Sequence, residues 1–357
     1  MPITANTLRL QQQLRAAVDQ IVDTQARDLV RAWADAWSEI QPDLTAVLLA
    51  ELTAGDKVTR AQLLRSTRLR QALAVVADRL EELSTASGVR IAGDLRGVVD
   101  TAGRAQASVI DSQLPANFMS PDDLATWSRV DARQIEAIVK RSTQQITALH
   151  KPLAPEAYQV VRRELVRGVA AGSNPRETAR RMVARAERYG FNGGLNRALV
   201  ISRTETLDAH RAAAHLGRQP HADVLAGWTW VAQLDTRTCP SCWGQHGTVH
   251  RVDEPGPFDH QQGRCTSLPT TKSWSDLGID IPEPPSLLPD ADTVFAGLPE
   301  AEQRTVLGPA RYAAWARGDY PIGGWSMRRR NDGWRDSYVP SPAPKPNGGR
   351  SPATSAA

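Results

Sequence analysis

The sequence predicts a protein of the α+β class that is mainly α, and three features lead to this prediction. Apolar residues recur at helical spacing through the first half of the chain, which is rich in Ala, Arg, Leu, Gln and Val. Seven of the ten tryptophans lie from Trp228 onward, where a short run of aromatic and β-branched residues is typical of a strand. From Pro340 the composition is Pro, Ser, Gly, Ala and Lys, which is typical of disorder. We therefore expect long N-terminal helices, a small α+β module and a disordered C-terminal tail.

The apolar spacing predicts a series of helices ahead of the strand. Pro42 is expected to kink or end the first helix, and Gly88 to end the second. Ser120 and Asn174 are expected to cap later helices, and the segment 190–194, with its glycines, to break the one that Asn174 starts. The expected helices cover about 7–50, 59–84, 90–113, 120–149, 155–169, 175–190 and 196–218.

The pattern changes after these helices. A strand is expected over 228–232, followed by turns and prolines around a cysteine cluster. A proline-rich extended stretch over 282–289 and short helices within 291–317 should follow. The expected domains are an extended helical arm or bundle at 1–150, the α+β module at 151–280, short helices and loops packing on it at 281–339, and the disordered tail at 340–357.

The bulk composition is ordinary for a soluble protein. The 357 residues are enough for two or three domains. A net charge of +4 is a mild excess that does not by itself indicate nucleic-acid binding. No N-terminal apolar leader is seen, and no run approaches the ~20 apolar residues of a membrane span. We therefore expect a protein that folds in the cytoplasm and has no membrane contact.

All three cysteines lie between positions 239 and 265, and they carry the clearest chemical signal in the chain. Cys239 and Cys242 form a C-P-S-C turn, and His260 and Cys265 follow in a second turn. Three thiolates and one imidazole are a donor set of tetrahedral zinc. Three cysteines cannot all pair within one chain, and reducing conditions disfavour disulfides. The spacing therefore predicts a Zn²⁺ site with Cys239, Cys242, His260 and Cys265 as ligands.

Alternatives to this ligand set stay open at the level of sequence. The cysteines can be reduced, metal-free and partly buried, with His260 at the surface. His246 or His250, in the same loop, can replace His260 as a ligand. Four protein ligands favour a closed, structural site, because a catalytic zinc keeps one position open for water.

Charged motifs flank the cysteines. Arg203-Thr204-Glu205 lies in the helix before the strand, and residues two apart on a helix do not face each other. Arg203 and Glu205 should therefore find separate partners, with a solvated helix face as the plainer alternative. Asp235 precedes Thr-Arg237-Thr at the end of the strand, where we expect an Asx-type turn.

A basic run lies further on. Arg328, Arg329 and Arg330 can bind phosphates, and the nearby Trp325 and Trp334 can stack on bases. We favour the plainer interpretation, a solvated loop beside packed tryptophans.

The order of these motifs resembles the phage Mu F-like head morphogenesis family, the minor head (minor capsid) proteins of tailed phages. In that family a helix with an R-T-E motif leads to a tryptophan strand, a D-x-R-x-C-x-x-C turn and an H-x-x-C-R-C-like segment. The resemblance covers about 155–275 and departs at Gly263, where the family often has a cysteine. The matching positions are Arg203, Thr204, Glu205, Asp235, Arg237, Cys239, Cys242, His260 and Cys265.

The resemblance implies a structural virion component and no established catalytic activity. Such a protein is expected in few copies, in the capsid interior near the portal, and in the host cytoplasm during assembly. The implied partners are the portal protein and the major capsid or scaffold protein. The mild positive charge also allows weak contact with packaged DNA.

The rival interpretation is an enzyme, a zinc-supported ββα (HNH-like) nuclease acting on DNA. His260 would be its general base, and Asp235 or Glu205 would hold a catalytic cation. Such nucleases usually show two C-x-x-C pairs and a separate catalytic histidine, whereas this chain has a single pair. If His260 binds zinc, it cannot also act as the base.

Overall fold

The computed structural model describes residues 2–53, 65–116, 118–128, 131–149, 163–164, 175–331 and 335–344. The chain divides into two compact units. The sheet unit comprises Met1–Ala16, Val99–Ile135 and His210–Ala357, and the helical unit comprises Ala17–Val98 and Glu136–Ala209. The boundaries between the two units fall inside long helices and differ from the domain boundaries expected from sequence. The expected domains therefore stay predictions.

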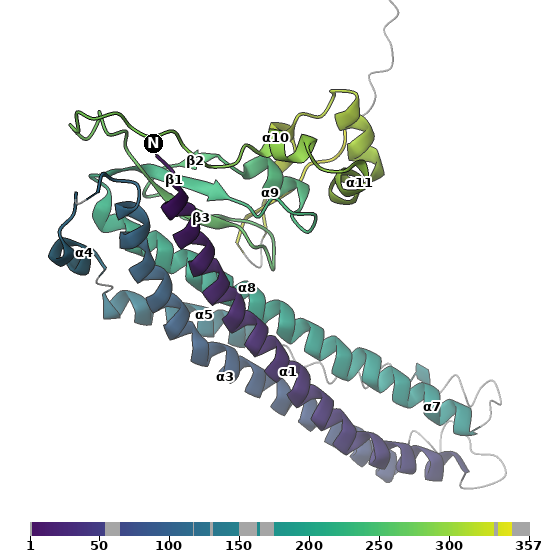
Figure 1. Cartoon of the computed structure of the whole chain (residues 1–357). Coiled ribbons are helices and arrows are strands. Elements are labelled where there is room, and N and C mark those ends of the chain that lie inside the picture. The colour runs from purple at the N-terminus through teal and green to yellow at the C-terminus, as the bar shows by residue number, and fades with distance from the viewer. Residues whose placement is uncertain are drawn as a thin grey trace, which may run out of the picture. The chain divides into compact units, whose positions relative to one another are not determined.

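The expected class, mainly α with a small α+β region, is confirmed (Figure 1). The α-helices are α1 Ala5–Thr53, α3 Thr67–Asp111, α4 Pro121–Trp127, α5 Ala132–Leu149, α7 Pro175–Arg185, α8 Asn192–Arg218, α9 Pro240–Gln245, α10 Ala291–Ala296 and α11 Glu300–Ala316. Shorter helical segments are the π-helix η1 Ala186–Phe191 and the 3₁₀ turns η2 Gln219–His221 and η3 Ile322–Gly324. The strands are β1 Leu225–Val231, β2 Val249–His250, β3 Thr266–Thr271, β4 Ser326–Arg329 and β5 Ser337–Pro340.

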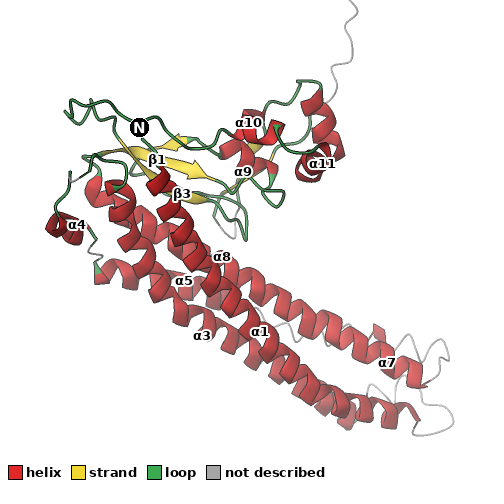
Figure 2. Ribbon diagram, in the orientation of Figure 1, coloured by secondary structure: helices red, strands yellow, loops and turns green. Residues whose placement is uncertain are grey.

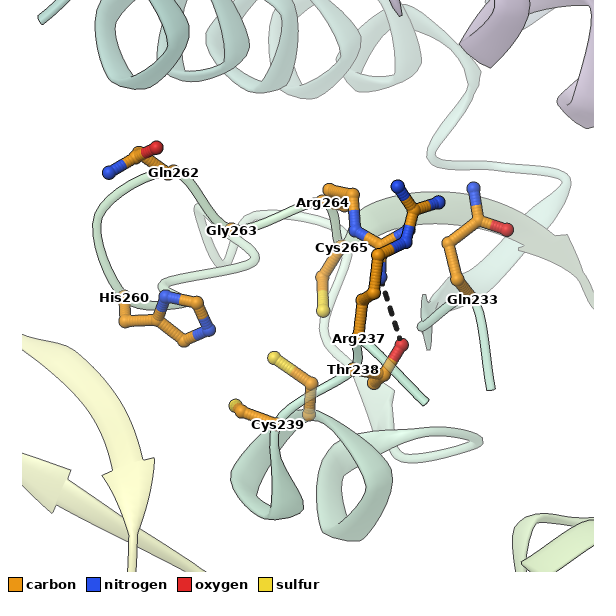
Figure 3. Close-up of a pocket in the computed structure, with 10 residues that line it drawn as sticks. Gln233, Arg237, Thr238, Cys239, His260, Gln262, Gly263, Arg264 and Cys265 are labelled. Atoms are coloured by element: carbon orange, nitrogen blue, oxygen red, sulfur yellow. Dashed lines mark hydrogen bonds between the residues drawn. The ribbon is translucent and has the colours of Figure 1, made fainter. Parts of the chain in front are cut away.

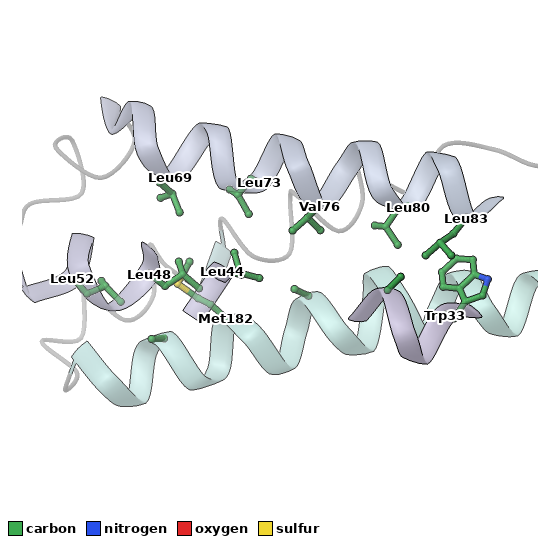
Figure 4. Packing of buried hydrophobic residues seen from close by; sticks show 13 residues of the cluster. Trp33, Leu44, Leu48, Leu52, Leu69, Leu73, Val76, Leu80, Leu83 and Met182 are labelled. Atoms are coloured by element: carbon green, nitrogen blue, oxygen red, sulfur yellow. The ribbon is translucent and has the colours of Figure 1, made fainter. Parts of the chain in front are cut away.

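The helical unit is held by an apolar core between α1, α3 and α7 (Figure 4). Leu44, Leu48 and Leu52 of α1 face Leu69 and other residues spaced at about one helical turn along α3. This regular spacing places one apolar stripe of each helix toward its neighbours. The α3 residues in the core are Leu69, Leu73, Val76, Leu80 and Leu83.

The long first helix is confirmed as α1, and Pro42 does not end it, because α1 continues to Thr53. The expected helix end at Gly88 is wrong, because α3 continues through it to Asp111. Pro42 cannot donate a backbone hydrogen bond, but Leu44 and Leu48 just beyond it are buried in the core. Burial of these side chains offsets the local cost, because most helix stability in proteins comes from tertiary packing. Ile91 and Leu95, which are also buried, continue α3 past Gly88 for the same reason.

The region after Ser120 is partly as expected. Ser120 forms a capping box with Asp123 and starts α4, but α4 ends at Trp127 and α5 begins at Ala132. The Ser128 hydroxyl donates to the Leu124 carbonyl, and the Asp131 carboxylate accepts the N–H of Arg133. These short polar side chains divide the expected single helix into two.

The expected break over 190–194 is replaced by the π-helix η1, which leads directly into α8. The helix expected over 155–169 lies outside the described residues, apart from helical residues 163–164. The expected tail likewise lies outside them from residue 345 onward.

The sheet unit contains a three-stranded antiparallel sheet in the order β2-β1-β3 (Figure 2). Its central strand pairs Trp228 with His250 on one side and Trp230 with Ser267 on the other. The strand expected over 228–232 is therefore confirmed, with its start three residues earlier, at Leu225. All of β3 is buried, which explains why its sequence shows no alternation of polar and apolar residues.

Polar side chains from α1 and from the turn after α3 hold β3. The Gln11 side chain of α1 donates to the Thr266 hydroxyl at 2.7 Å. The Gln113 side chain donates to the Pro269 carbonyl at 2.8 Å and accepts the N–H of Thr271 at 3.3 Å. These bonds give buried polar groups of the strand partners outside the sheet.

The C-terminal part forms a second apolar core within the sheet unit. Trp243 of α9 and Trp325 are both fully buried against Phe295 of α10. The short helices expected within 291–317 are confirmed as α10 and α11. Among the described residues, no helix is long and apolar enough to span a membrane.

Candidate metal centre

The candidate metal ligands come from two segments of the sheet unit that are separate in sequence (Figure 3). Cys239 occupies the N-cap position of α9, and Cys242 lies in its first turn. Pro240 takes the first helical position, where its missing N–H costs nothing. His260 and Cys265 flank a short loop that leads into β3.

The donor atoms converge. The ligand atoms of Cys239, Cys242 and His260 all lie within 4.8 Å of one another. Cys265, the fourth predicted ligand, is not part of this group, and its thiol interacts with that of Cys242. Figure 3 shows Cys239, His260 and Cys265 around one space. This pocket is lined by Gln233, Arg237, Thr238, Cys239, Cys242, His260, Gln262, Gly263, Arg264 and Cys265.

The two cysteines of the C-P-S-C turn differ in acidity. Hydrogen bonding from Cys242, assisted by His260, lowers the pKa of the Cys239 thiol to about 4. The same hydrogen bond, with burial and the nearby Cys265, raises the pKa of the Cys242 thiol. Hydrogen bonding to Cys239 raises the pKa of His260 to about 9. Without a metal, the interaction therefore favours the charged forms of both groups, a Cys239 thiolate and a His260 imidazolium.

The orientation of the His260 ring suits metal binding. Its Nδ1 lies 2.7 Å from the carbonyl oxygen of Gln261, and a carbonyl can only accept, so Nδ1 carries the proton. This arrangement leaves Nε2 as the nitrogen with a free lone pair once the imidazole is neutral. Metal-binding histidines commonly donate their other N–H to a carbonyl in this way.

The two alternative histidines have other partners. His246 accepts the N–H of Ala232 at Nδ1 and contacts the Pro289 carbonyl through Nε2 at 3.0 Å. The His250 ring stacks on Trp228 at 4.2 Å, and its nitrogens contact Thr248 and Glu254. Both rings are therefore engaged away from the thiols, which leaves His260 as the histidine of the cluster.

A buried charge network supports the second ligand segment. The Asp259 carboxylate is fully buried and accepts from Arg211 at 2.7 Å and from the N–H of Cys265 at 3.2 Å. Arg211 also donates to the carbonyls of Gly263 and Cys265. Arg335 pairs with the other Asp259 oxygen at 3.3 Å. These bonds hold both ends of the loop from His260 to Cys265.

Gly263 is required by this network. A Cβ atom at residue 263 would lie 2.1 Å from the Asp259 Oδ2 oxygen, which is far inside contact distance. Glycine stands here where the family often has a cysteine, because the loop backbone approaches Asp259 too closely for a side chain.

The expected Asx turn at Asp235 is present and has a second role. The Asp235 carboxylate accepts from the N–H of Arg237 and from the Thr238 hydroxyl. It also forms a bidentate pair with Arg264, with distances of 2.8 and 2.6 Å. Hydrogen bonding from Arg264 is the main cause that holds the pKa of Asp235 well below its usual range. The pair ties the turn before Cys239 to the residue before Cys265, whereas the Arg237 side chain is exposed.

The Arg203-Thr204-Glu205 motif lies in the helical unit. Arg203 pairs with Asp19 of α1 at 3.7 Å, which confirms that it finds a partner other than Glu205. Thr204 and Glu205 are buried, so the expectation of a solvated helix face is wrong for them.

The basic run lies on β4 and just beyond it. Arg328, Arg329 and Arg330 are exposed, and Arg328 pairs with Asp336 at 3.1 Å. Trp325 is fully buried and donates to the Tyr320 carbonyl, so it has no surface for stacking on a base. Trp334 lies outside the described residues.

Sequence reasoning missed the arginines that organise the site. Arg211, Arg264 and Arg335 all bond to carboxylates or carbonyls of the ligand segments. Arg15 of α1 also donates to the Arg264 carbonyl at 3.2 Å. The one available signal was the adjacency of Asp259 and His260, because an acidic residue next to a ligand often marks a supporting network.

The donor chemistry fits a metal ion. Thiols and an imidazole suit soft or borderline divalent ions better than magnesium or calcium, which prefer oxygen ligands. The residues present can therefore hold such an ion, with Asp259 and its arginines orienting them from behind.

The fold and the site together define a mainly helical protein with an α+β module whose cysteines and histidine form a candidate metal centre. Residues 159–268 match the family model described as Phage Mu protein F like protein. The resemblance inferred from the order of the motifs is therefore confirmed over this part of the chain. The chain matches no curated protein and no solved structure.

Proposed function

We propose that this chain is a structural minor head protein of a tailed phage, acting in head morphogenesis. The observation that carries the proposal is the phage Mu F-like match over 159–268, which contains Cys239, Cys242, His260 and Cys265. Proteins of that family are head components, so the partners we propose are the portal protein and the major capsid or scaffold protein. The proposed location is the capsid interior near the portal, and the host cytoplasm during assembly.

The proposed cofactor is one structural Zn²⁺ held by Cys239, Cys242, His260 and Cys265. Two thiols and the imidazole already converge within 4.8 Å, and Cys265 is hydrogen-bonded to Cys242. A bound ion would join α9 to the loop before β3, and such binding contributes directly to folding. No step of catalysis is proposed at the ion, because four protein ligands leave no position for water.

A structural role is also supported because the residues that a nuclease would use are engaged in other interactions or buried. Asp235 is committed to a bidentate pair with Arg264, and Glu205 is fully buried in the helical unit. His260 is hydrogen-bonded to Cys239, and if His260 binds the metal, its lone pair is no longer available to act as a general base. We therefore propose that the chain is not an enzyme. The exposed arginines 328–330 leave weak contact with packaged DNA as part of the proposal.

Elemental analysis of purified protein tests the metal. We expect one zinc per chain, and loss of the zinc in His260→Ala. The matched control is His250→Ala, which removes a histidine from the same region that is engaged with Thr248 and Glu254. Folded wild-type protein without stoichiometric metal would contradict the proposed cofactor.

Phage particles test the assembly role. We expect a phage that lacks this protein to form fewer or defective heads, and a tagged copy to co-purify with the portal protein from procapsids. Normal, infectious particles formed without the protein would contradict the proposal. A magnesium- or manganese-dependent cleavage of DNA that exceeds a His260→Ala control would instead support the nuclease.

A further inference from the structure

The β4–β5 hairpin, which follows the family-matched segment, contacts both halves of the metal centre. Strand β4 pairs with β5 in antiparallel register from Ser326 opposite Pro340 to Arg329 opposite Ser337. The hairpin lies beyond residue 268, where the match to the phage Mu F-like family ends. Its contacts with the ligand segments are therefore a feature of this chain that the match does not cover.

One side of the hairpin contacts α9, the helix that carries Cys239 and Cys242. The Ser326 hydroxyl lies 2.8 Å from the hydroxyl of Ser241, which is buried. In the sequence, Ser241 lies between Cys239 and Cys242. The approach of the backbones is close, because a Cβ at Gly244 would lie 2.7 Å from the Ile322 carbonyl oxygen just before β4. This contact braces the first pair of ligands.

The other side contacts the segment that carries His260. The N–H of Tyr338 donates to the Phe258 carbonyl at 2.8 Å. Arg335 donates to the Asp259 carbonyl at 2.8 Å and lies 3.3 Å from its Oδ1 oxygen. Its guanidinium also lies over the Phe258 ring, 5.6 Å from the centroid.

Asp259 transmits this contact to the ligands. It is the residue before His260, and its Oδ2 oxygen accepts the N–H of Cys265. The carboxylate is fully buried between Arg335 on one oxygen and Arg211 on the other. Each arginine contacts a different oxygen, so the two together fix the orientation of the carboxylate.

We propose that Arg335 is a positioning residue of the metal centre, which acts through Asp259 to hold His260 and Cys265 in ligating position. The hairpin is therefore a structural part of the centre. Because coupling between two sites is reciprocal, an ion bound at the cysteines must in turn stabilise the hairpin. This inference rests on the proposed metal binding.

Metal affinity measured by competition with a chromogenic chelator tests the role of Arg335. Supporting residues of this kind typically change metal affinity by about 10–100-fold, so we expect Arg335→Met to weaken Zn²⁺ binding by that factor. Arg335→Lys should recover part of the loss, because an ammonium group can still donate to Asp259. The matched control is Arg329→Met, an exposed arginine of the same hairpin, whose affinity should equal that of the wild type.

Cobalt substitution separates positioning from general loss of structure. In Arg335→Met, saturating Co²⁺ should still give thiolate-to-metal absorption bands, with their midpoint at a higher Co²⁺ concentration. Equal affinities for Arg335→Met and Arg329→Met, in a wild type that does bind metal, would overturn this inference alone. Absence of metal binding by the wild type would overturn both it and the proposed cofactor.

Hydrogen exchange of the wild-type protein provides a test that needs no variant. We expect backbone amides of β4 and β5 to exchange at least several-fold more slowly in the Zn²⁺-loaded protein than after chelation. The amides of α7, in the helical unit, serve as an internal reference. Identical exchange of the hairpin in the two states, with the ligand loop protected by metal, would show that the hairpin is not coupled to the centre.

Discussion

Replacing Asp259 by Asn should destabilise the sheet unit more than any surface change of the same kind. Asp259→Asn keeps the shape of the side chain and removes a negative charge that is fully buried between Arg211 and Arg335. Arg211 itself is almost completely buried, so its charge would stay in a medium of low polarity without its anion. Breaking a buried ion pair by removing one partner typically costs about 3–5 kcal/mol.

We expect the lower end of this range, about 3 kcal/mol, because Arg211 keeps the carbonyls of Gly263 and Cys265 as acceptors. Urea unfolding of the metal-loaded protein, followed by tryptophan fluorescence, measures the change. Trp228 and Trp230 of β1 lie in the sheet unit and report its unfolding. With a urea dependence of about 2 kcal/mol/M, the midpoint should fall by about 1.5 M.

The matched control is Asp253→Asn, which removes an exposed carboxylate paired only at the surface with Arg251. Surface pairs contribute little to stability, so this variant should unfold with the wild type. A decrease of less than about 1 kcal/mol for Asp259→Asn would refute the reasoning, because it would mean that the buried charge is not stabilised by its two arginines.

Four further predictions concern other residues of the protein. In metal-free protein at pH 6, iodoacetamide should alkylate Cys239 faster than Cys242, because the pKa of Cys239 is lowered to about 4 and that of Cys242 is raised. Tandem mass spectrometry distinguishes the two alkylated cysteines. Equal rates would contradict the assignment of Cys239 as the thiolate. The contribution of Cys239, whose pKa is lowered from 9.0 to about 4, is fully present above pH 9 and is lost as the pH falls to about 4. The contribution of His260, whose pKa is raised from 6.5 to about 9, is fully present below pH 6.5 and is lost as the pH rises to about 9. The two changes oppose each other between pH 6.5 and 9, so thermal scans of chelated protein should show a plateau of stability there and a decrease as the pH falls from 6.5 to about 4. Gly263→Ala should lower stability by at least about 1–3 kcal/mol through overpacking against Asp259, whereas Gly323→Ala, where a Cβ meets nothing within 4 Å, should be nearly neutral. In the helical unit, Leu48→Ala should cost about 2–5 kcal/mol by chemical denaturation, and Val89→Ala, at an exposed position, should cost little.

Local patterns in the sequence were sufficient for much of the fold. The helical period of the apolar residues identified the long helices, since each must bury one stripe. Ser120 marked the start of α4 because its capping box with Asp123 is a purely local interaction. Trp228 and its neighbours marked β1. The clustering of all three cysteines between residues 239 and 265 marked the candidate metal centre, because thiols so close in sequence have few other common uses.

Only the tertiary structure decided where helices continue and what holds the ligands in place. Leu44 and Leu48 carry α1 past Pro42 by packing on α3, and such burial depends on a partner helix that the local sequence does not contain. Likewise, Asp259 meets Arg211 and Arg335 across sequence separations of 48 and 76 residues. Such pairs form because burial brings distant charges together, and neither residue type nor spacing in the chain specifies which arginine will meet which carboxylate.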